Sequence, residues 1–282
     1  MFQRTVVIGA GTMGNGIAHV MAQAGISTTL VDTNNHQLQV ALETISKNLD
    51  RQIKKGILTE TDKVQTLSHV TITDDLIQAV QHADLVIEAA TENLDIKLKI
   101  FKQVDELAPE HCILASNTSS ISITKISTAT LRPHKVIGMH FMNPVPVMKL
   151  VEIINGKLTE KEVTQSIVDL CLALGKTPCI VNDAPGFISN RILMPMINEA
   201  IYALHEGVAE KESIDTIMKL GMAHPMGPLQ LADLIGLDTC LNIITVLREG
   251  FNNPKYDPCP LLISMVNAGK LGVKTGEGFY KY

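Results

Sequence analysis

A strand-like run at the start of the chain enters a turn with three glycines and continues into a helix-compatible segment, which is the context that makes this common kind of turn informative. Residues 5–8 read Thr-Val-Val-Ile, and glycines follow at positions 9, 11 and 14. The first glycine permits a tight turn, the second lets a pyrophosphate approach the backbone, and the third lets the next helix pack on the strand. Phosphates bind at the positive N-terminus of that helix. The pattern predicts a dinucleotide site formed by Gly9, Ala10, Gly11, Thr12, Met13 and Gly14.

A carboxylate further along the chain agrees with this interpretation. A second apolar run, residues 28–31, ends at Asp32, which lies 23 positions after Gly9 (32 − 9). The spacing is close to the roughly 20 residues expected for a carboxylate that binds the adenosine ribose. Residues 33–35 read Thr-Asn-Asn and offer no Arg or Lys to a 2′-phosphate. We therefore expect NAD rather than NADP; the alternative is a purely structural turn.

Strand-like and helix-like segments alternate over roughly the first two thirds of the chain. Beyond the glycine turn, the strand-like segments are residues 28–31, 84–89, 112–115, 136–139, 151–154 and 179–181. Helical patterns cover residues 13–24, 37 to about 63 with a break near Gly56, 75–81, 92–107 and 160–174. The alternation predicts an α/β fold with a Rossmann-type, doubly wound, mostly parallel sheet.

The strand signals stop at Asp183-Ala184-Pro185-Gly186, and helical patterns then cover residues 188–206, 211–220, 228–248 and 260–268. We expect an NAD-binding domain over residues 1–184 and an all-helical substrate and dimerisation domain over residues 185–282. About 100 residues of helix cannot easily bury all of their apolar stripes. A homodimer through this domain is therefore expected, and packing on the first domain is the alternative. The stripes contain Ile192, Met196, Ile197, Ile235, Leu237, Leu241 and Ile244.

Composition excludes several classes of function. The formal charge is −5 and the 24 basic residues are scattered, so nucleic acid is not an expected partner. No run reaches the roughly 18 apolar residues of a membrane span. The N-terminus has no charged-then-apolar leader, so a cytoplasmic location is expected. The five cysteines are odd in number and form no CxxC pair, which favours free thiols and no metal site.

Two groups of polar residues stand where strands are expected to end. Residues 116–120 read Ser-Asn-Thr-Ser-Ser, which suits either a helix cap or a ligand site. His140 follows residues 136–139, and Glu152 comes 12 positions later (152 − 140). A carboxylate bound to one imidazole nitrogen fixes the tautomer and stabilises the imidazolium. The other nitrogen can then remove a hydroxyl proton, although a lone His is more often structural.

Several long strings of residues resemble those of one enzyme family. The chain is similar throughout to the short-chain L-3-hydroxyacyl-CoA dehydrogenases, above all the bacterial 3-hydroxybutyryl-CoA dehydrogenases. The strings that carry the resemblance are residues 7–14, 115–120, 138–144, 146–152, 185–187, 190–191 and 224–228. Their order and unusual composition make the match specific.

The resemblance implies a role for individual residues. His140 would be the general base and Glu152 its orienting partner, with Ser119 and Asn190 on the substrate oxygens. The purely structural alternatives are that Ser119 is a turn residue and that Asn190 is a helix N-cap. The residues implied near the dinucleotide are Glu92, Lys97, Asn117, Asn143 and Lys274, and those near the CoA tail are Arg51 and Lys55.

Several of these assignments have simple structural alternatives, and two positions depart from the family's pattern. Glu92 and Lys97 could be helix-surface charges, Lys274 an exposed tail residue, and the basic run of Arg51, Lys54 and Lys55 a solvated helix face. Arg51 stands where Lys is expected, which changes the geometry of phosphate binding. Phe141-Met142 replaces Phe-Phe, which leaves the chemistry unaltered.

The expected function is an NAD-dependent interconversion of an L-3-hydroxyacyl-CoA, expected to be 3-hydroxybutyryl-CoA, and the 3-oxoacyl-CoA. One alternative is another β-hydroxyacid dehydrogenase that acts on a free acid. The other is a catalytically idle, NAD-binding structural relative. No single motif encodes the acyl-chain length or the physiological direction.

Overall fold

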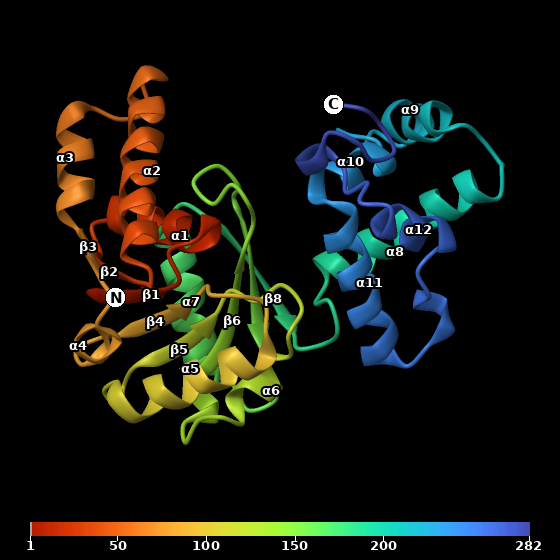
Figure 1. Ribbon diagram of the computed structural model, residues 1–282. Coiled ribbons are helices and arrows are strands. Elements are labelled where there is room, and N and C mark those ends of the chain that lie inside the picture. Colours follow the sequence, from red (N-terminus) through yellow and green to blue (C-terminus); the bar gives the residue numbers. More distant parts are fainter. Residues whose placement is uncertain (1) are drawn as a thin grey trace. The chain divides into compact units, whose positions relative to one another are not determined.

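The computed structural model describes residues 2–282, which divide into two compact units, with the boundary in the chain between Asp183 and Ala184 (Figure 1). The first unit is built on an eight-stranded sheet with the order β3-β2-β1-β4-β5-β6-β7-β8. Within the described residues every neighbouring pair is parallel except β6 and β7. The strands are β1 (Arg4–Ile8), β2 (Ser27–Val31), β3 (Val70–Thr73), β4 (Leu85–Glu88), β5 (Ile113–Ser116), β6 (Val136–Phe141), β7 (Leu150–Asn155) and β8 (Thr177–Asn182).

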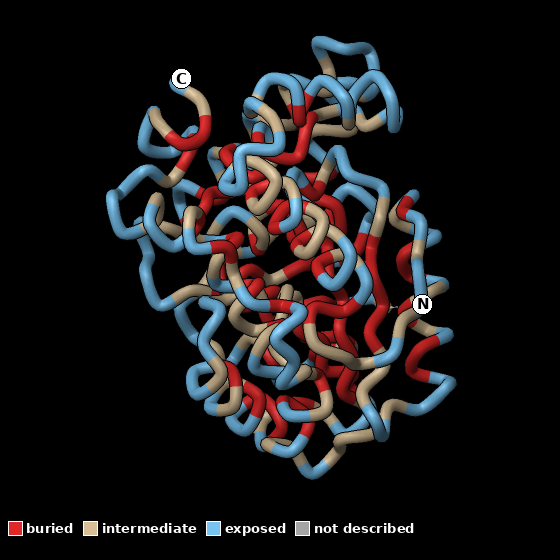
Figure 2. Tube along the Cα trace, turned by 90° about the vertical axis from the view of Figure 1, so that its right-hand side faces the viewer, coloured by how far each residue is buried: buried red, intermediate tan, exposed pale blue. Residues whose placement is uncertain are grey.

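The strand order confirms the predicted Rossmann-type sheet and locates its ligand edge. The order reverses between β1 and β4, and in open α/β sheets ligands bind beyond the carboxyl ends of the strands at such a point. The strands β4, β5 and β6 are buried along their whole length. Figure 2 shows buried segments mostly inside the trace and exposed segments mostly along its outer turns. The residues at the carboxyl ends of β4, β5 and β6 are therefore held by a buried, hydrogen-bonded sheet.

Polar side chains set the starts of several helices in this unit. Asn34 accepts hydrogen bonds from the backbone N–H groups of His36 and Gln37, and Thr59 forms a capping box with Asp62. The long crossover between β2 and β3 therefore folds as two helices, which lie side by side in Figure 1. The helices are α1 (Thr12–Gln23), α2 (Asn35–Lys54), α3 (Glu60–Ser68), α4 (Leu76–Val80), α5 (Leu94–Leu107), α6 (Ile123–Ser127), α7 (Lys161–Ala173) and the 3₁₀ turn η1 (Pro133–Lys135).

The second unit is helical and has a core of its own. Its elements are α8 (Ser189–His205), α9 (Lys211–Gly221), α10 (Pro228–Ile235), α11 (Leu237–Phe251) and α12 (Pro260–Asn267), with the 3₁₀ turns η2 (Pro254–Tyr256) and η3 (Val273–Thr275). The buried carboxylate of Asp233 accepts the backbone N–H groups of Phe279 and Tyr280 and the Tyr282 hydroxyl. The C-terminal tail is thereby anchored to α10.

Three local expectations from the sequence were wrong. Strand β3 was not expected, although its Val-Thr-Ile-Thr run alternates apolar and polar β-branched residues; it is an edge strand with no fully buried residue, so it lacks the continuous apolar run of the central strands. The single helix expected over residues 228–248 is two helices, because Gly236 adopts φ 102°, which breaks the helical backbone. His140 lies inside β6 rather than after it.

The apolar stripes of the helical unit are only partly buried within it. Ile197, Leu237 and Ile244 are buried in the core of this unit, because its helices enclose them. Ile192, by contrast, is 66% exposed. Only part of the stripe is therefore surface that a partner could cover.

In the part of the chain that the structure describes, no single helix is long and apolar enough to span a membrane. Together α10 and α11 pass by length and composition, but they meet at a bend of 98°.

Candidate active site

The glycine turn leads from β1 into α1 with the geometry that a dinucleotide needs. A Cβ at Gly9 would lie 2.6 Å from the Ala89 carbonyl oxygen, and one at Gly14 would lie 1.6 Å from the Gly9 carbonyl oxygen. At Gly11 a Cβ would meet no heavy atom within 4 Å. Gly9 and Gly14 therefore serve the packing of the turn, whereas Gly11 faces open space. No side chain within the described residues caps the first turn of α1, which leaves its N–H groups to an anion.

Asp32, at the end of β2, is bound to the turn itself. Its Oδ2 accepts the Ala10 N–H at 2.7 Å, and its Oδ1 accepts the Asn34 N–H at 2.9 Å. Each carboxylate oxygen has a second lone pair, so ribose hydroxyls can still donate to it. The residues of this edge thus fit a dinucleotide: an open glycine, an uncapped helix start and a carboxylate beside them.

His140 and Glu152 come together across the antiparallel pair β6 and β7. The two residues are direct partners in the strand register, and His140 Nδ1 lies 2.8 Å from Glu152 Oε2. Both are buried, with exposures of 8% and 3%. The pair lies at the carboxyl end of β6, whose parallel neighbour β5 ends at the same edge of the sheet.

Glu92 accepts hydrogen bonds from several residues of the polar segment that follows β5. Its Oε1 accepts the Thr118 hydroxyl at 2.6 Å, and it also accepts the backbone N–H and hydroxyl groups of Ser119 and Ser120 at 2.9 to 3.2 Å. Burial tends to raise the pKa of Glu92, but the Lys97 charge and these hydrogen bonds outweigh it and lower the pKa. A carboxylate at Glu92 therefore holds residues 118–120, called here the Ser119 segment, through hydrogen bonds.

Asn117 joins this segment to the strand of His140. Its Oδ1 accepts the Phe141 N–H at 2.9 Å, and its own N–H donates to the Glu88 carbonyl oxygen at 2.7 Å. The ends of β4, β5 and β6 are thus held together around Ser119 and His140.

Sequence reasoning missed Glu88. Its carboxylate binds Lys97 Nζ at 2.7 and 2.8 Å, and each of these two residues is only 1% exposed. The interpretation of Lys97 as a helix-surface charge was therefore wrong. A charged residue at the end of the apolar run Leu85-Val86-Ile87 was the signal that could have revealed Glu88.

The remaining predicted residues of the first unit are exposed. Arg51 and Lys55 lie at the end of α2, where Arg51 also donates to the Asn48 side chain at 3.1 Å. Asn143 lies in the loop between β6 and β7. None of these positions conflicts with contact to a ligand.

Asn190 and Lys274 belong to the second unit. Asn190 lies inside the first turn of α8, whose N-cap position is Ile188, so the N-cap alternative was wrong. Lys274 Nζ binds the Asp238 carboxylate, 2.6 Å from Oδ2. Among residues 2–282, no group of three or more His, Cys, Asp or Glu side chains could hold a metal ion.

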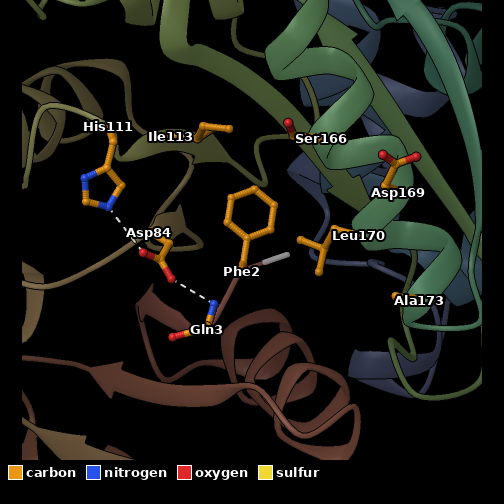
Figure 3. A pocket seen from close by; sticks show the side chains of 9 residues that line it. All are labelled: Phe2, Gln3, Asp84, His111, Ile113, Ser166, Asp169, Leu170 and Ala173. Carbon is orange, nitrogen blue, oxygen red and sulfur yellow. Dashed lines mark hydrogen bonds and ion pairs between the residues drawn. The ribbon is translucent and has the colours of Figure 1, made fainter.

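A cavity of about 560 Å³ opens at the opposite, amino edge of the sheet (Figure 3). Asp84 lies on its wall and accepts the backbone N–H groups of Gln3 and Arg4 at 2.8 and 2.9 Å and contacts His111 Nε2 at 3.2 Å. Burial tends to raise the pKa of Asp84, and these hydrogen bonds more than offset it, so the pKa is lowered. Asp84 therefore ties β1 to β4, and this cavity is not part of the site described above.

The first unit has the architecture of a nicotinamide-dependent dehydrogenase: a glycine turn at the switch point of a parallel sheet, with a His–Glu pair at the same edge. Two family models match the chain. The 3-hydroxyacyl-CoA dehydrogenase NAD binding domain matches residues 4–184, and the 3-hydroxyacyl-CoA dehydrogenase C-terminal domain matches residues 186–282. The chain belongs to the 3-hydroxyacyl-CoA dehydrogenase family, whose members are NAD-dependent enzymes that act on an acyl-CoA thioester.

Individual relatives agree with this membership. A probable 3-hydroxybutyryl-CoA dehydrogenase of Bacillus subtilis is 53% identical over 280 residues, which cover 99% of this chain and 97% of that protein. The 3-hydroxybutyryl-CoA dehydrogenase of Bradyrhizobium diazoefficiens is 50% identical over 282 residues, covering 100% and 96%. The crystal structure of (S)-3-hydroxybutyryl-CoA dehydrogenase from Ralstonia eutropha has a TM-score of 0.97 and 50% identity, and covers 100% of this chain and 99% of that chain. The matches confirm the predicted resemblance, the fold class and NAD as the cofactor.

Proposed function

We propose that the chain interconverts L-3-hydroxybutyryl-CoA and acetoacetyl-CoA, with His140 as the general base and Glu152 as its orienting partner. The observation that carries this proposal is the buried contact of 2.8 Å between His140 Nδ1 and Glu152 Oε2. The four-carbon substrate is supported by relatives described as 3-hydroxybutyryl-CoA dehydrogenases, which align along nearly the whole chain.

Glu152 directs the chemistry to one nitrogen of the imidazole. Because Nδ1 is bound to the carboxylate, proton exchange with the substrate passes through Nε2. In the oxidative direction Nε2 takes the proton of the 3-hydroxyl group, and Glu152 stabilises the resulting imidazolium. In the reductive direction the same nitrogen returns the proton to the 3-oxo oxygen. NAD, when bound, supplies the hydride acceptor or donor. A positioned base of this kind contributes about 10²–10⁴-fold in rate.

The other site residues divide between substrate and cofactor. Ser119 and Asn190 hold the reacting oxygens of the substrate. The glycine turn, Asp32, Glu92, Lys97, Asn117, Asn143 and Lys274 bind the dinucleotide or line its site. The exposed basic end of α2, with Arg51, Lys54 and Lys55, receives the phosphates of the CoA tail.

The test is His140→Gln, assayed with acetoacetyl-CoA and NADH by absorbance at about 340 nm. We expect kcat to fall by about 10²–10⁴-fold. The matched control is His111→Gln, which removes another imidazole beside a carboxylate, Asp84, at the opposite edge of the sheet. It should retain the wild-type kcat. Near-wild-type turnover by His140→Gln would show that His140 is not the base.

We also propose that the protein is a homodimer through its helical unit. Ile192, Leu220 and Leu234 are large apolar side chains of this unit, with exposures of 66%, 81% and 57%. Covering such side chains removes apolar area from water, which is favourable. The molar mass from light scattering at micromolar concentration tests this: twice the chain mass is expected, and a monomer would refute it.

A further inference from the structure

The carboxylate of Glu88 is the centre of a buried polar cluster at the carboxyl edge of the sheet. One oxygen, Oε1, accepts the Ala90 N–H at 2.7 Å and contacts Lys97 Nζ at 2.7 Å. The other, Oε2, accepts the Ser116 hydroxyl at 2.6 Å and contacts the same ammonium at 2.8 Å. Glu88 therefore joins the end of β4 to α5 and to the end of β5.

Two routes lead from this carboxylate to the Ser119 segment. On the first, the Ser116 hydroxyl oxygen accepts the Thr118 N–H at 3.2 Å. On the second, Lys97 Nζ lies 3.5 Å from Glu92 Oε2, and the other oxygen of Glu92 accepts the Ser119 N–H at 3.0 Å. Residues on both sides of Ser119 are thus held by groups that Glu88 holds.

The cluster also supports the glycine turn. The Ala90 N–H that Glu88 accepts belongs to the turn against which Gly9 packs, since a Cβ at Gly9 would lie 2.9 Å from Ala90 N. The Glu88 carboxylate therefore fixes the backbone at Ala90, beside the glycine turn, and, through Ser116, the backbone at Thr118, beside Ser119.

The buried ion pair of Glu88 and Lys97 is not readily explained by a contribution to folding stability alone. Burying two charges costs several kcal/mol of desolvation in general, and well-packed apolar residues often do as well or better. A reacting group, however, must be held to within roughly 0.5 Å by a fully hydrogen-bonded supporting shell. Glu88 and Lys97 are completely buried and bound on every oxygen and on the ammonium, so they can supply that rigidity.

We propose that Glu88 is a positioning residue for the reaction, which acts through Ser116 and Lys97 to hold the Ser119 hydroxyl at the carboxyl edge of β5. The inference rests on the proposed function, because it takes Ser119 as the residue that holds a substrate oxygen. Glu88 itself contacts neither substrate nor cofactor on this view.

The first test compares two substitutions of different severity. Glu88→Gln keeps the side-chain shape but removes the charge, and Ser116→Ala removes only the hydroxyl between Glu88 and Thr118. We expect kcat with acetoacetyl-CoA and NADH to fall by about 10²-fold in the first and about tenfold in the second. KM for acetoacetyl-CoA should change by less than about threefold, because the loss arises in the transition state. Wild-type kcat in both variants would overturn the proposal. If Glu88→Gln does not fold, the kcat of Ser116→Ala alone decides, and a wild-type value would again overturn the proposal.

A matched control separates positioning from stability. Asp105 is another buried carboxylate of this unit, and it accepts Arg132 Nε and the Leu131 N–H, both at 2.7 Å, near the end of α5 that is distant from the site. Asp105→Asn should lower the melting temperature as Glu88→Gln does, while kcat stays within about threefold of wild type. An equal loss of kcat in the two variants would show that Glu88 only stabilises the fold.

A double-mutant cycle tests the route through Ser119. We expect Glu88→Gln to reduce kcat by less than about threefold further when Ser119 is already Ala, because groups that act as a unit are not additive. A fully additive loss overturns the route from Glu88 and leaves the role of Ser119 intact. Wild-type kcat in Ser119→Ala alone overturns the Ser119 assignment together with this route, whereas the role of His140 is tested separately by His140→Gln.

Discussion

His140 and Glu152 face each other directly across β6 and β7, the one antiparallel pair among the described strands of the sheet. Directly opposed residues of an antiparallel pair have Cβ atoms about 4.5–5.5 Å apart, which brings an imidazole and a carboxylate within hydrogen-bonding reach. A register slip of one residue would move one of the two side chains to the other face of the sheet. The dyad is therefore a property of the strand register, not only of two side chains.

The first prediction concerns Glu152. Glu152→Gln keeps the side-chain size but removes the charge that stabilises the imidazolium, and its amide can donate to Nδ1 and so favour the wrong tautomer. We expect kcat to fall by about 10²–10⁴-fold, with a smaller change in the KM for NADH. Steady-state kinetics across a pH series measure both effects. A kcat within about threefold of wild type would exclude the orienting role.

The second prediction separates two glycines of the turn. Gly11→Ala meets no protein atom within 4 Å, so its melting temperature should stay within about 2 °C of wild type. Its methyl group would occupy the approach of the pyrophosphate, so the Kd for NADH should rise at least about tenfold.

Gly14→Ala is the comparison for that experiment. Its Cβ would lie 1.6 Å from the Gly9 carbonyl oxygen, so the backbone must move and the unit should be destabilised by several kcal/mol, roughly 3 or more. Thermal melts and NADH fluorescence titrations distinguish the two variants. Equal melting temperatures would contradict the different roles assigned to these glycines.

The third prediction concerns Asp32. Asp32→Ala removes the acceptor of the Ala10 and Asn34 N–H groups and the proposed partner of the ribose hydroxyls. The Kd for NAD should rise about tenfold or more, and the preference for NAD over NADP should narrow, because the carboxylate also repels a 2′-phosphate. Asp32→Asn is the control that keeps an oxygen acceptor of the same size. Unchanged NAD affinity in Asp32→Ala would remove Asp32 from the site.

The fourth prediction concerns Lys176, a buried lysine just before β8. Its Nζ donates to the carbonyl oxygens of Val145 and Met148 at 2.5 and 2.8 Å, in the loop that joins β6 to β7. Burial lowers the pKa of Lys176. Lys176→Met leaves two carbonyl groups without this donor and should lower the free energy of unfolding by about 1–3 kcal/mol. Urea denaturation checks this, with the exposed Lys149→Met as the control that should stay close to wild type.

The fifth prediction is a pH dependence of stability caused by His19. The pKa of His19 is lowered from 6.5 to about 4: burial is the largest cause, the Lys176 charge lowers the pKa as well, and a hydrogen bond with Gln23 opposes them. Its Nδ1 has no hydrogen-bond partner among the described residues. As the pH falls below 6.5 the unfolded chain takes up this proton before the folded protein does. The folded state therefore loses stability as the pH falls from 6.5 to about 4, by about 3 kcal/mol in all for this residue.

The measurement for His19 is urea denaturation of the wild type and of His19→Gln at about pH 7 and about pH 4.5. The variant lacks the titrating ring, so its stability should fall less between the two values. An identical fall in both proteins would show that His19 does not contribute.

Local sequence patterns were sufficient for most elements of the fold. Apolar runs with β-branched residues predicted seven of the eight strands, and β3 was missed because this half-exposed edge strand alternates threonines with apolar residues and forms no apolar run. The helix break at Gly236 was missed because a glycine within a helical pattern is often tolerated, and only the observed φ of 102° shows that the backbone turns there. Asp32 was found because its distance from the glycine turn is set by a single β-α-β unit.

The class of the protein follows from local sequence signals: the glycine turn, the alternation of strands and helices, and the strings around Ser119 and His140 identify a Rossmann-type dehydrogenase. These signals lie within a few turns or strands of chain, so propensity and spacing are enough to read them. The pairing of His140 with Glu152 was expected, but the strand register that makes them direct partners, and the contacts of Glu88 with Ala90, Lys97 and Ser116, are visible only in the folded protein. Those contacts join strands and helices that are separate in the sequence, and no local pattern encodes which buried side chains meet.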